Sequence, residues 1–408
     1  MQRLKKCAAF IFLLFILNIS ASANYNIHNP FPDDNSDGRA GRADRIEKID
    51  IFGEIFDIAG AGDISRDLPE DARDYLDSED LSGELALENI SGKFNFGFIF
   101  NIIMSITGGL VSAAVKNFLP VLALIILSAA VMAVNGLGRS DKSESFAEIL
   151  NFVMLVCLAG AIFYNMRDCF YIAKRFLDDI HAYMMSMIPV MASLSTLSGN
   201  IAAAAANSAG LFAVLNIVEA ISARVILPVL QICYALALAR CLSESSGSVN
   251  LSGVSAYIRS ILNWIFIFIM TVLVTIIFFQ NVLAASADTV AARTVKFTVS
   301  SFVPVVGGVL GDATSTVMGS MQAVKSVTGV FGVLVIIITL LPPLINIILH
   351  KLLLNISGAF ALILGLDKQS GFLKEMGSLL DMTLAVMIAV SVVFIFDIAV
   401  FIKTMAVV

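Results

Sequence analysis

Long apolar segments follow one another from about residue 98 onward, and they constrain the fold more than any other feature. A helix needs about 20 apolar residues to cross the roughly 30 Å of hydrocarbon in a membrane. Five segments are long enough: Phe118–Leu137, Ile149–Met166, Ile261–Ala285, Val330–His350 and Met382–Ile402. Another, Ser208–Arg240, exceeds one crossing and contains Pro228. Because lipid cannot satisfy backbone polar groups, we expect an all-α polytopic membrane protein.

The first 23 residues have the pattern of a secretory signal peptide. Basic residues, among them Arg3, precede a short apolar stretch, and Ala21–Ala23 supplies the small residues that a signal peptidase requires. An uncleaved anchor is the alternative interpretation. Cys7 lies inside the signal and not at a cleavage junction, which argues against a lipoprotein anchor.

Residues 24–97 form an acidic segment, with 18 Asp and Glu against 7 Lys and Arg. Apolar residues recur every three or four positions between Ile46 and Ala59, which predicts an amphipathic helix. A second helix is expected to start near Leu68-Pro69, because proline suits a first helical turn. We therefore expect a small extracytoplasmic helical segment. Its helices either cover each other or present a face to a partner.

The segments that follow are expected in a definite order along the chain. An interfacial amphipathic helix at 98–117 precedes a first transmembrane helix and its loop at 118–148, and a final transmembrane helix occupies 376–408. Two weaker stretches, Ile180–Leu197 and Val295–Leu310, contain prolines and are expected to be half-membrane or re-entrant. The total is six to eight transmembrane or re-entrant helices.

Two proline motifs recur at one ungapped offset of 115 residues. Pro189 aligns with Pro304, and Pro228 aligns with Pro343. This predicts an internal repeat, with copies at 149–245 and 264–360. Duplicated units with broken helices at corresponding positions are typical of a pathway near the membrane midplane. We therefore expect Pro189 and Pro304 to lie in the interior. If the proline stretches turn back, each copy crosses twice, and otherwise three times, and Lys and Arg counts favour neither topology.

Charged and small residues within the apolar part are the remaining site candidates. Glu219 and Arg224 lie five apart in one long segment, where ideal helical partners lie three or four apart. Charge at membrane depth is costly, so each should face protein or water, either as a packing ion pair or along a pathway. Asp381 and Asp397 are expected near helix ends. Asp312 follows the second proline stretch, and Gly307 and Gly308 provide a small-residue packing surface.

No signature of catalysis or cofactor binding is present in the sequence. It contains no P-loop, no HExxH and no GxSxG motif, and no CxxC pair. The histidines are far apart in sequence, and the basic residues are scattered. We therefore expect no enzyme, no cofactor, no metal and no binding to nucleic acid.

One region resembles the stage III sporulation protein AE family. It is RTVKFTVSSFVPVVGGVLGDATSTVMGSMQAVKSVTGVFG, from Arg293 to Gly332. The residues that carry most of the match are Arg293, Thr294, Lys296, Phe297, Pro304, Asp312, Ala313 and Thr314. The order of signal peptide, exported helical segment and multiple crossings is also similar, so the likeness spans essentially the whole chain.

The resemblance implies an integral protein of the mother-cell membrane around the forespore, with an extracytoplasmic N-terminal segment. It implies a subunit of a channel that joins the two cells and supports late forespore gene expression. Implied partners are other stage III A proteins including a cytoplasmic ATPase, stage II protein Q indirectly, membrane lipid and further copies of the chain. A free-standing secondary transporter and an assembly scaffold without its own pathway remain alternative functions.

Overall fold

Every secondary-structure element that can be described is a helix. The computed structural model describes residues 96–137, 141–197, 201–245 and 307–403, with Leu68, Pro69, Arg73 and scattered positions between 257 and 275. The elements are α5 (Phe96–Leu137), α6 (Asp141–Leu197), α7 (Ile201–Ile221), the π-helix η2 (Ser222–Ile226), α8 (Leu227–Ser245), α10 (Gly307–Ile363) and α11 (Asp367–Lys403). The predicted all-α class is confirmed.

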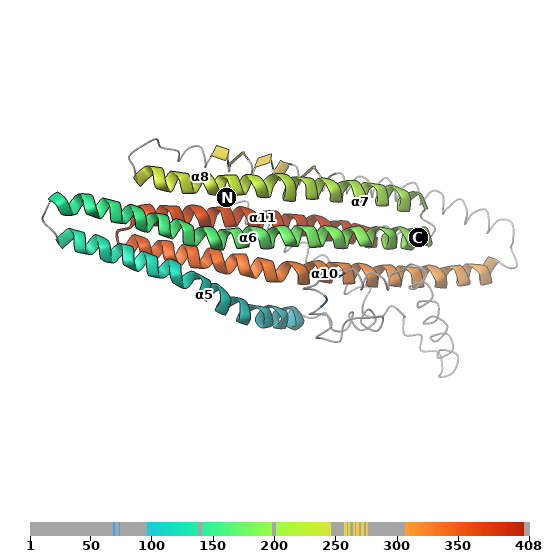
Figure 1. Cartoon of the computed structure of the whole chain (residues 1–408). Coiled ribbons are helices and arrows are strands. Elements are labelled where there is room, and N and C mark those ends of the chain that lie inside the picture. The colour runs from blue at the N-terminus through green and yellow to red at the C-terminus, as the bar shows by residue number, and fades with distance from the viewer. Residues whose placement is uncertain are drawn as a thin grey trace.

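The helices form one elongated bundle (Figure 1). α6, α10 and α11 pack against one another, α5 packs on α6 and α10, and α7 and α8 cover the other side of α6. At one end lie the α5–α6 connection, the last turn of α8 and the α10–α11 turn (Figure 1). We call this the turn end. The opposite end, where α6 gives way to α7 and where α10 begins, is the far end.

The helices are much longer than a membrane is thick. α6 and α10 each contain 57 residues, or about 85 Å at 1.5 Å per residue, against about 30 Å of hydrocarbon. Five helices are long and apolar enough to cross a membrane, over Thr107–Val131, Phe152–Leu197, Ser208–Arg240, Ser320–Ile363 and Asp367–Ala399. These are spans of the described residues alone, and most of the predicted crossing at 261–285 lies outside them.

Two breaks that the sequence analysis expected do not occur. α6 runs through both Ile149–Met166 and Ile180–Leu197 as one helix with Pro189 inside it, so the second stretch does not turn back. α5 likewise runs from Phe96 to Leu137 without a boundary between 117 and 118. Proline removes one hydrogen bond and glycine costs about 1 kcal/mol in a helix. Packing along a long bundle offsets penalties of this size.

The α10–α11 turn is closed by a Schellman motif. Gly365 has φ of +75°, a conformation that only glycine adopts without strain. Its N–H donates to Leu362 O at 3.0 Å, and Leu366 N–H donates to Ala361 O at 2.9 Å, which is the paired pattern of this cap. Ala361 and Leu366 are both buried. The turn therefore directs α11 back along α10.

The predicted internal repeat is not confirmed. α6 ends at Leu197 and α7 begins at Ile201, but the positions 115 residues further on, Asp312 and Thr316, both lie within continuous α10. The first proposed copy therefore reverses direction where the second does not. The first half of the second copy falls largely outside the described residues.

Candidate functional site

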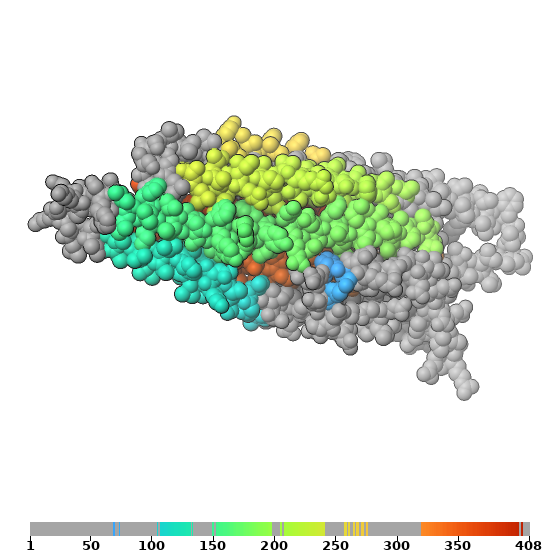
Figure 2. Space-filling model, viewed as in Figure 1, coloured from blue at the N-terminus to red at the C-terminus, as the bar shows by residue number. Residues whose placement is uncertain are grey.

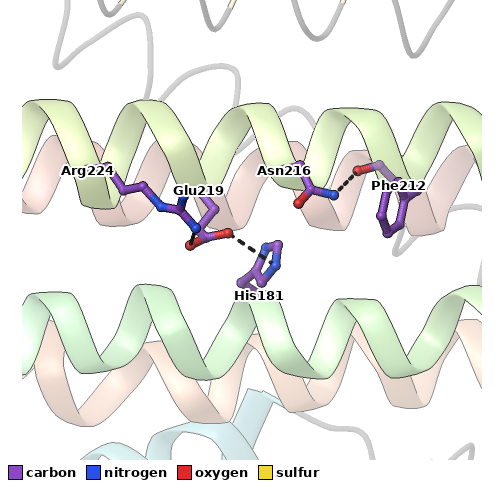
Figure 3. Close-up of polar contacts among 5 residues, drawn as sticks. All are labelled: His181, Phe212, Asn216, Glu219 and Arg224. Atoms are coloured by element: carbon purple, nitrogen blue, oxygen red, sulfur yellow. Dashed lines mark hydrogen bonds and ion pairs between the residues drawn. The ribbon is translucent and has the colours of Figure 1, made fainter.

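Three polar side chains meet on the outside of the bundle, between α6 and α7 (Figure 3). Glu219 Oε1 accepts a hydrogen bond from Arg224 Nη2 at 2.9 Å, and Glu219 Oε2 lies 3.4 Å from His181 Nε2. One carboxylate thus bridges a guanidinium on its own helix and an imidazole on the neighbouring helix. We call these three residues the charged triad.

The π-helix η2 explains how Glu219 reaches Arg224. On a regular α-helix, side chains five residues apart do not share a face. In a π-turn the hydrogen bond runs from residue i+5 to residue i, and here Leu227 N–H donates to Ser222 O. This wider turn rotates Arg224 toward Glu219. The spacing that made the two residues imperfect helical partners is therefore the spacing that a π-turn favours.

The triad extends from a partly buried base to an exposed tip. The side chains of Glu219 and His181 are each 18% exposed, whereas that of Arg224 is 71% exposed. His181 Nδ1 is buried without a hydrogen-bond partner in the described part of the chain. The arrangement concentrates exchangeable protons and charge on an outward surface.

Two further ion pairs join α11 to its neighbours. Arg240 Nη1 on α8 donates to Glu375 Oε2 on α11 at 3.0 Å, and Lys351 Nζ on α10 donates to Asp381 Oδ1 on α11. Asp381 was expected near a helix end, but it lies well inside α11 and pairs with Lys351. These pairs tie α11 to two neighbours.

Two buried charges lie between α10 and α11 toward the far end. Lys325 is only 1% exposed, and its Nζ lies 4.3 Å from the ring centroid of Phe401, within the range of a cation–π contact. Asp397 is 8% exposed, and its Oδ2 has no hydrogen-bond partner among the described groups. Asp397 therefore faces the core, not the interface that the sequence suggested.

The prolines do not converge on one interior site. Pro189 lies on the exposed side of α6, so the expectation that it marks the interior is wrong. Pro228 is exposed near the start of α8, whereas Pro343 is buried within α10. Pro304 lies outside the described residues. Pro189 does not need a protein interior around it. A proline within a helix leaves only one carbonyl without its N–H donor, and a single alternative partner satisfies that carbonyl.

The residues of the family resemblance lie at or before the start of α10. Gly307 and Gly308 open this helix, and Asp312, Ala313 and Thr314 follow in its first turns. The remaining five, Arg293, Thr294, Lys296, Phe297 and Pro304, lie outside the described residues. None of these residues belongs to the charged triad.

His181 and Lys325 are the polar residues that sequence reasoning missed. His181 was treated as an isolated histidine, because its partner Glu219 is 38 residues away on another helix. Lys325 lies in an otherwise apolar segment, and that position was a usable signal, since a charge within such a helix faces the protein interior.

Comparisons with known proteins agree on one family. The family model described as "Stage III sporulation protein AE (spore_III_AE)" matches residues 82–405. A curated relative, "Stage III sporulation protein AE" of Bacillus subtilis (strain 168), is 21% identical over 231 residues, which are 57% of this chain and 56% of that protein. The match thus spans little more than half of the relative's length. No solved structure is detectably similar. The chain belongs to the stage III sporulation protein AE family.

Proposed function

We propose that this protein is a non-enzymatic subunit of the channel apparatus that joins mother cell and forespore. It acts in the mother-cell membrane with its N-terminal segment extracytoplasmic, together with other stage III A proteins, a cytoplasmic ATPase and, indirectly, stage II protein Q. The observation that carries the proposal is the family match over residues 82–405, which includes every long helix of the bundle.

The polar groups of the bundle support a role beyond anchoring. A protein that only anchors others needs no charged side chains buried in its core, because burying a charge lowers the stability of the folded bundle. Here Lys325 and Asp397 are buried, and the charged triad reaches the surface through Arg224. A polar outward face of this kind suits a subunit that borders an aqueous route together with further copies of itself.

Leucine substitutions at Glu219 and Arg224 test this proposal. Glu219→Leu and Arg224→Leu should lower the yield of heat-resistant spores and the activity of a late forespore reporter gene, because each removes charge from the route. Co-purification with the other stage III A proteins should be unchanged. Arg175→Leu is the matched control, since Arg175 forms an exposed pair with Asp179 on α6 at 3.7 Å, outside the triad.

The alternative functions give different results. Normal spore yields from both triad variants would contradict a role in the route and favour an assembly scaffold. Purified protein that moved a solute across liposomes without any partner would instead identify a free-standing transporter.

A further inference from the structure

The outward face of α6 changes character along its length. In its first part, the exposed side chains are mainly large and apolar: Ile149, Phe152, Val153, Val156 and Phe163. In its last part, the exposed residues are Ala182, Pro189 and Thr196. The two parts are equally helical and both pack on the same bundle, so the difference concerns what surrounds each part.

Neighbouring helices share the apolar surface at the same level. α5 and α6 are joined at the turn end, so residues equally far from that connection lie side by side, and α5 exposes Leu119, Ile126 and Leu127 there. α10 ends nearby, and its last turns expose Ile348, Leu352, Ile356, Phe360 and Ile363. Together these side chains form an apolar surface on α5, α6 and α10 at the turn end, which we call the apolar belt. On α6 it covers residues 149–166, or about 27 Å, close to the thickness of the hydrocarbon.

Charged residues end the apolar belt on the side of the far end. Arg167 and Asp168 are followed by Lys174, Arg175, Asp178 and Asp179, and all six are at least partly exposed. The exposed rings of Tyr164 and Tyr171 flank the first of these charges, and Arg167 lies 5.7 Å from the Tyr164 ring centroid. Tyrosine and basic residues gather at membrane–water interfaces. The charged triad lies on the far-end side of this boundary.

The described residues of the acidic N-terminal segment lie at the same far half of the bundle. Leu68 and Pro69 are buried, Leu68 belongs to the main core, and they lie beside α6 beyond its midpoint (blue in Figure 2). Arg73 N–H donates to Pro69 O at 2.9 Å, which fits a helix starting near Pro69. A segment with the charge density of residues 24–97 cannot dock on a surface that lipid tails cover.

We propose that lipid surrounds only the turn end of the bundle, and that the far end projects from the membrane as a helical shaft on the exported side. From Arg167 to Leu197, α6 extends about 45 Å beyond the boundary. The side on which the shaft stands rests on the proposed extracytoplasmic N-terminal segment. The five long helices then cross once each, and the end of α5, the start of α6, the end of α8 and the turn at 364–366 lie toward the cytoplasmic face.

Spin labels at single cysteines test the position of the boundary. Cys157 is exposed within the apolar belt and serves as the native lipid-facing site once the other cysteines are replaced. Ala182→Cys and Thr196→Cys, each in a fully cysteine-free background, probe the shaft. The full chain is placed in liposomes, and the spin relaxation of each label is measured with oxygen and with a water-soluble nickel chelate. Oxygen should accelerate relaxation most at Cys157, and the nickel chelate should accelerate it most at positions 182 and 196.

The proposal would be overturned if the label at position 182 or at position 196 were relaxed mainly by oxygen, or by neither reagent. The side is measured separately in intact cells, where an impermeant maleimide should label Thr196→Cys but not Arg139→Cys. The reverse pattern would place the shaft in the cytoplasm. Both readouts concern geometry alone, so they stand whether or not the triad variants change sporulation.

Discussion

Two antiparallel helix pairs of the bundle, α10–α11 and α6–α7, hold together in different ways. In α10–α11 the packing is tight, because a Cβ added to Gly329 would overlap the Ile402 side chain and one added to Gly332 would lie 3.1 Å from Ile398 Cδ1. Charges in this pair are buried or half-buried, as Lys325 and Lys351 show. In α6–α7 the contact includes the charged triad, whose tip is exposed. The comparison indicates that α10–α11 is the structural centre, whereas α6–α7 presents polar chemistry to its surroundings.

The largest effect is expected from Gly329→Leu. Its side chain must overlap Ile402 on α11, and overpacking a tight core costs about 1–3 kcal/mol, occasionally more. Thermal unfolding in detergent should show a large drop in Tm or a failure to accumulate. Gly371→Ala on α11 is the matched control, since nothing lies within 4 Å of its added Cβ. Equal effects from both would show that the α10–α11 pair is not closely packed.

Asp381→Leu should lower the stability of the bundle by about 2 kcal/mol, because it leaves the partly buried Lys351 ammonium without its carboxylate. Lys351→Met combined with Asp381→Leu should recover much of this loss, since both charges are then gone. Unfolding of the three variants in detergent measures the difference. A double variant less stable than the single one would contradict a simple pair.

Asp397→Asn should leave stability unchanged or raise it by about 1 kcal/mol. The Asp397 carboxylate is buried with one oxygen unpartnered in the described structure, and an ionised group in that position is costly. The amide has nearly the same shape and carries no charge. A marked loss of Tm would contradict this expectation. It would mean that the Asp397 carboxylate stabilises the folded bundle, and that a polar group is required within α10–α11.

The smallest effect on stability is expected from Arg224→Ala. Its side chain is 71% exposed, and surface ion pairs contribute about 0–1 kcal/mol. Unfolding curves should nearly overlay those of the unchanged protein. A loss as large as that of Asp381→Leu would remove the contrast between the two helix pairs.

Helical class and apolar spans were predictable from local pattern, because hydrophobic length depends on neighbouring residues alone. The apolar span Ser208–Arg240 was predicted with the bounds that it has within α7, η2 and α8. The continuity of α6 through Pro189 and of α5 through residues 117 and 118 was not predicted, since the packing that keeps a helix continuous comes from other helices. The charged triad was not predictable from local pattern, because it depends on the π-turn in η2 and on His181 from α6. Pairing across helices, as between Lys351 and Asp381, depends on the antiparallel register, which the sequence does not display.

The continuity of α6 through Pro189 has a mechanical consequence. A single helix of about 85 Å behaves as a lever, so that a tilt of about 5° at the turn end displaces its tip by roughly 7 Å. Motion imposed on the turn end would therefore reach the far end without any change in internal packing. Pro189, close to the tip, is where such a lever would bend first.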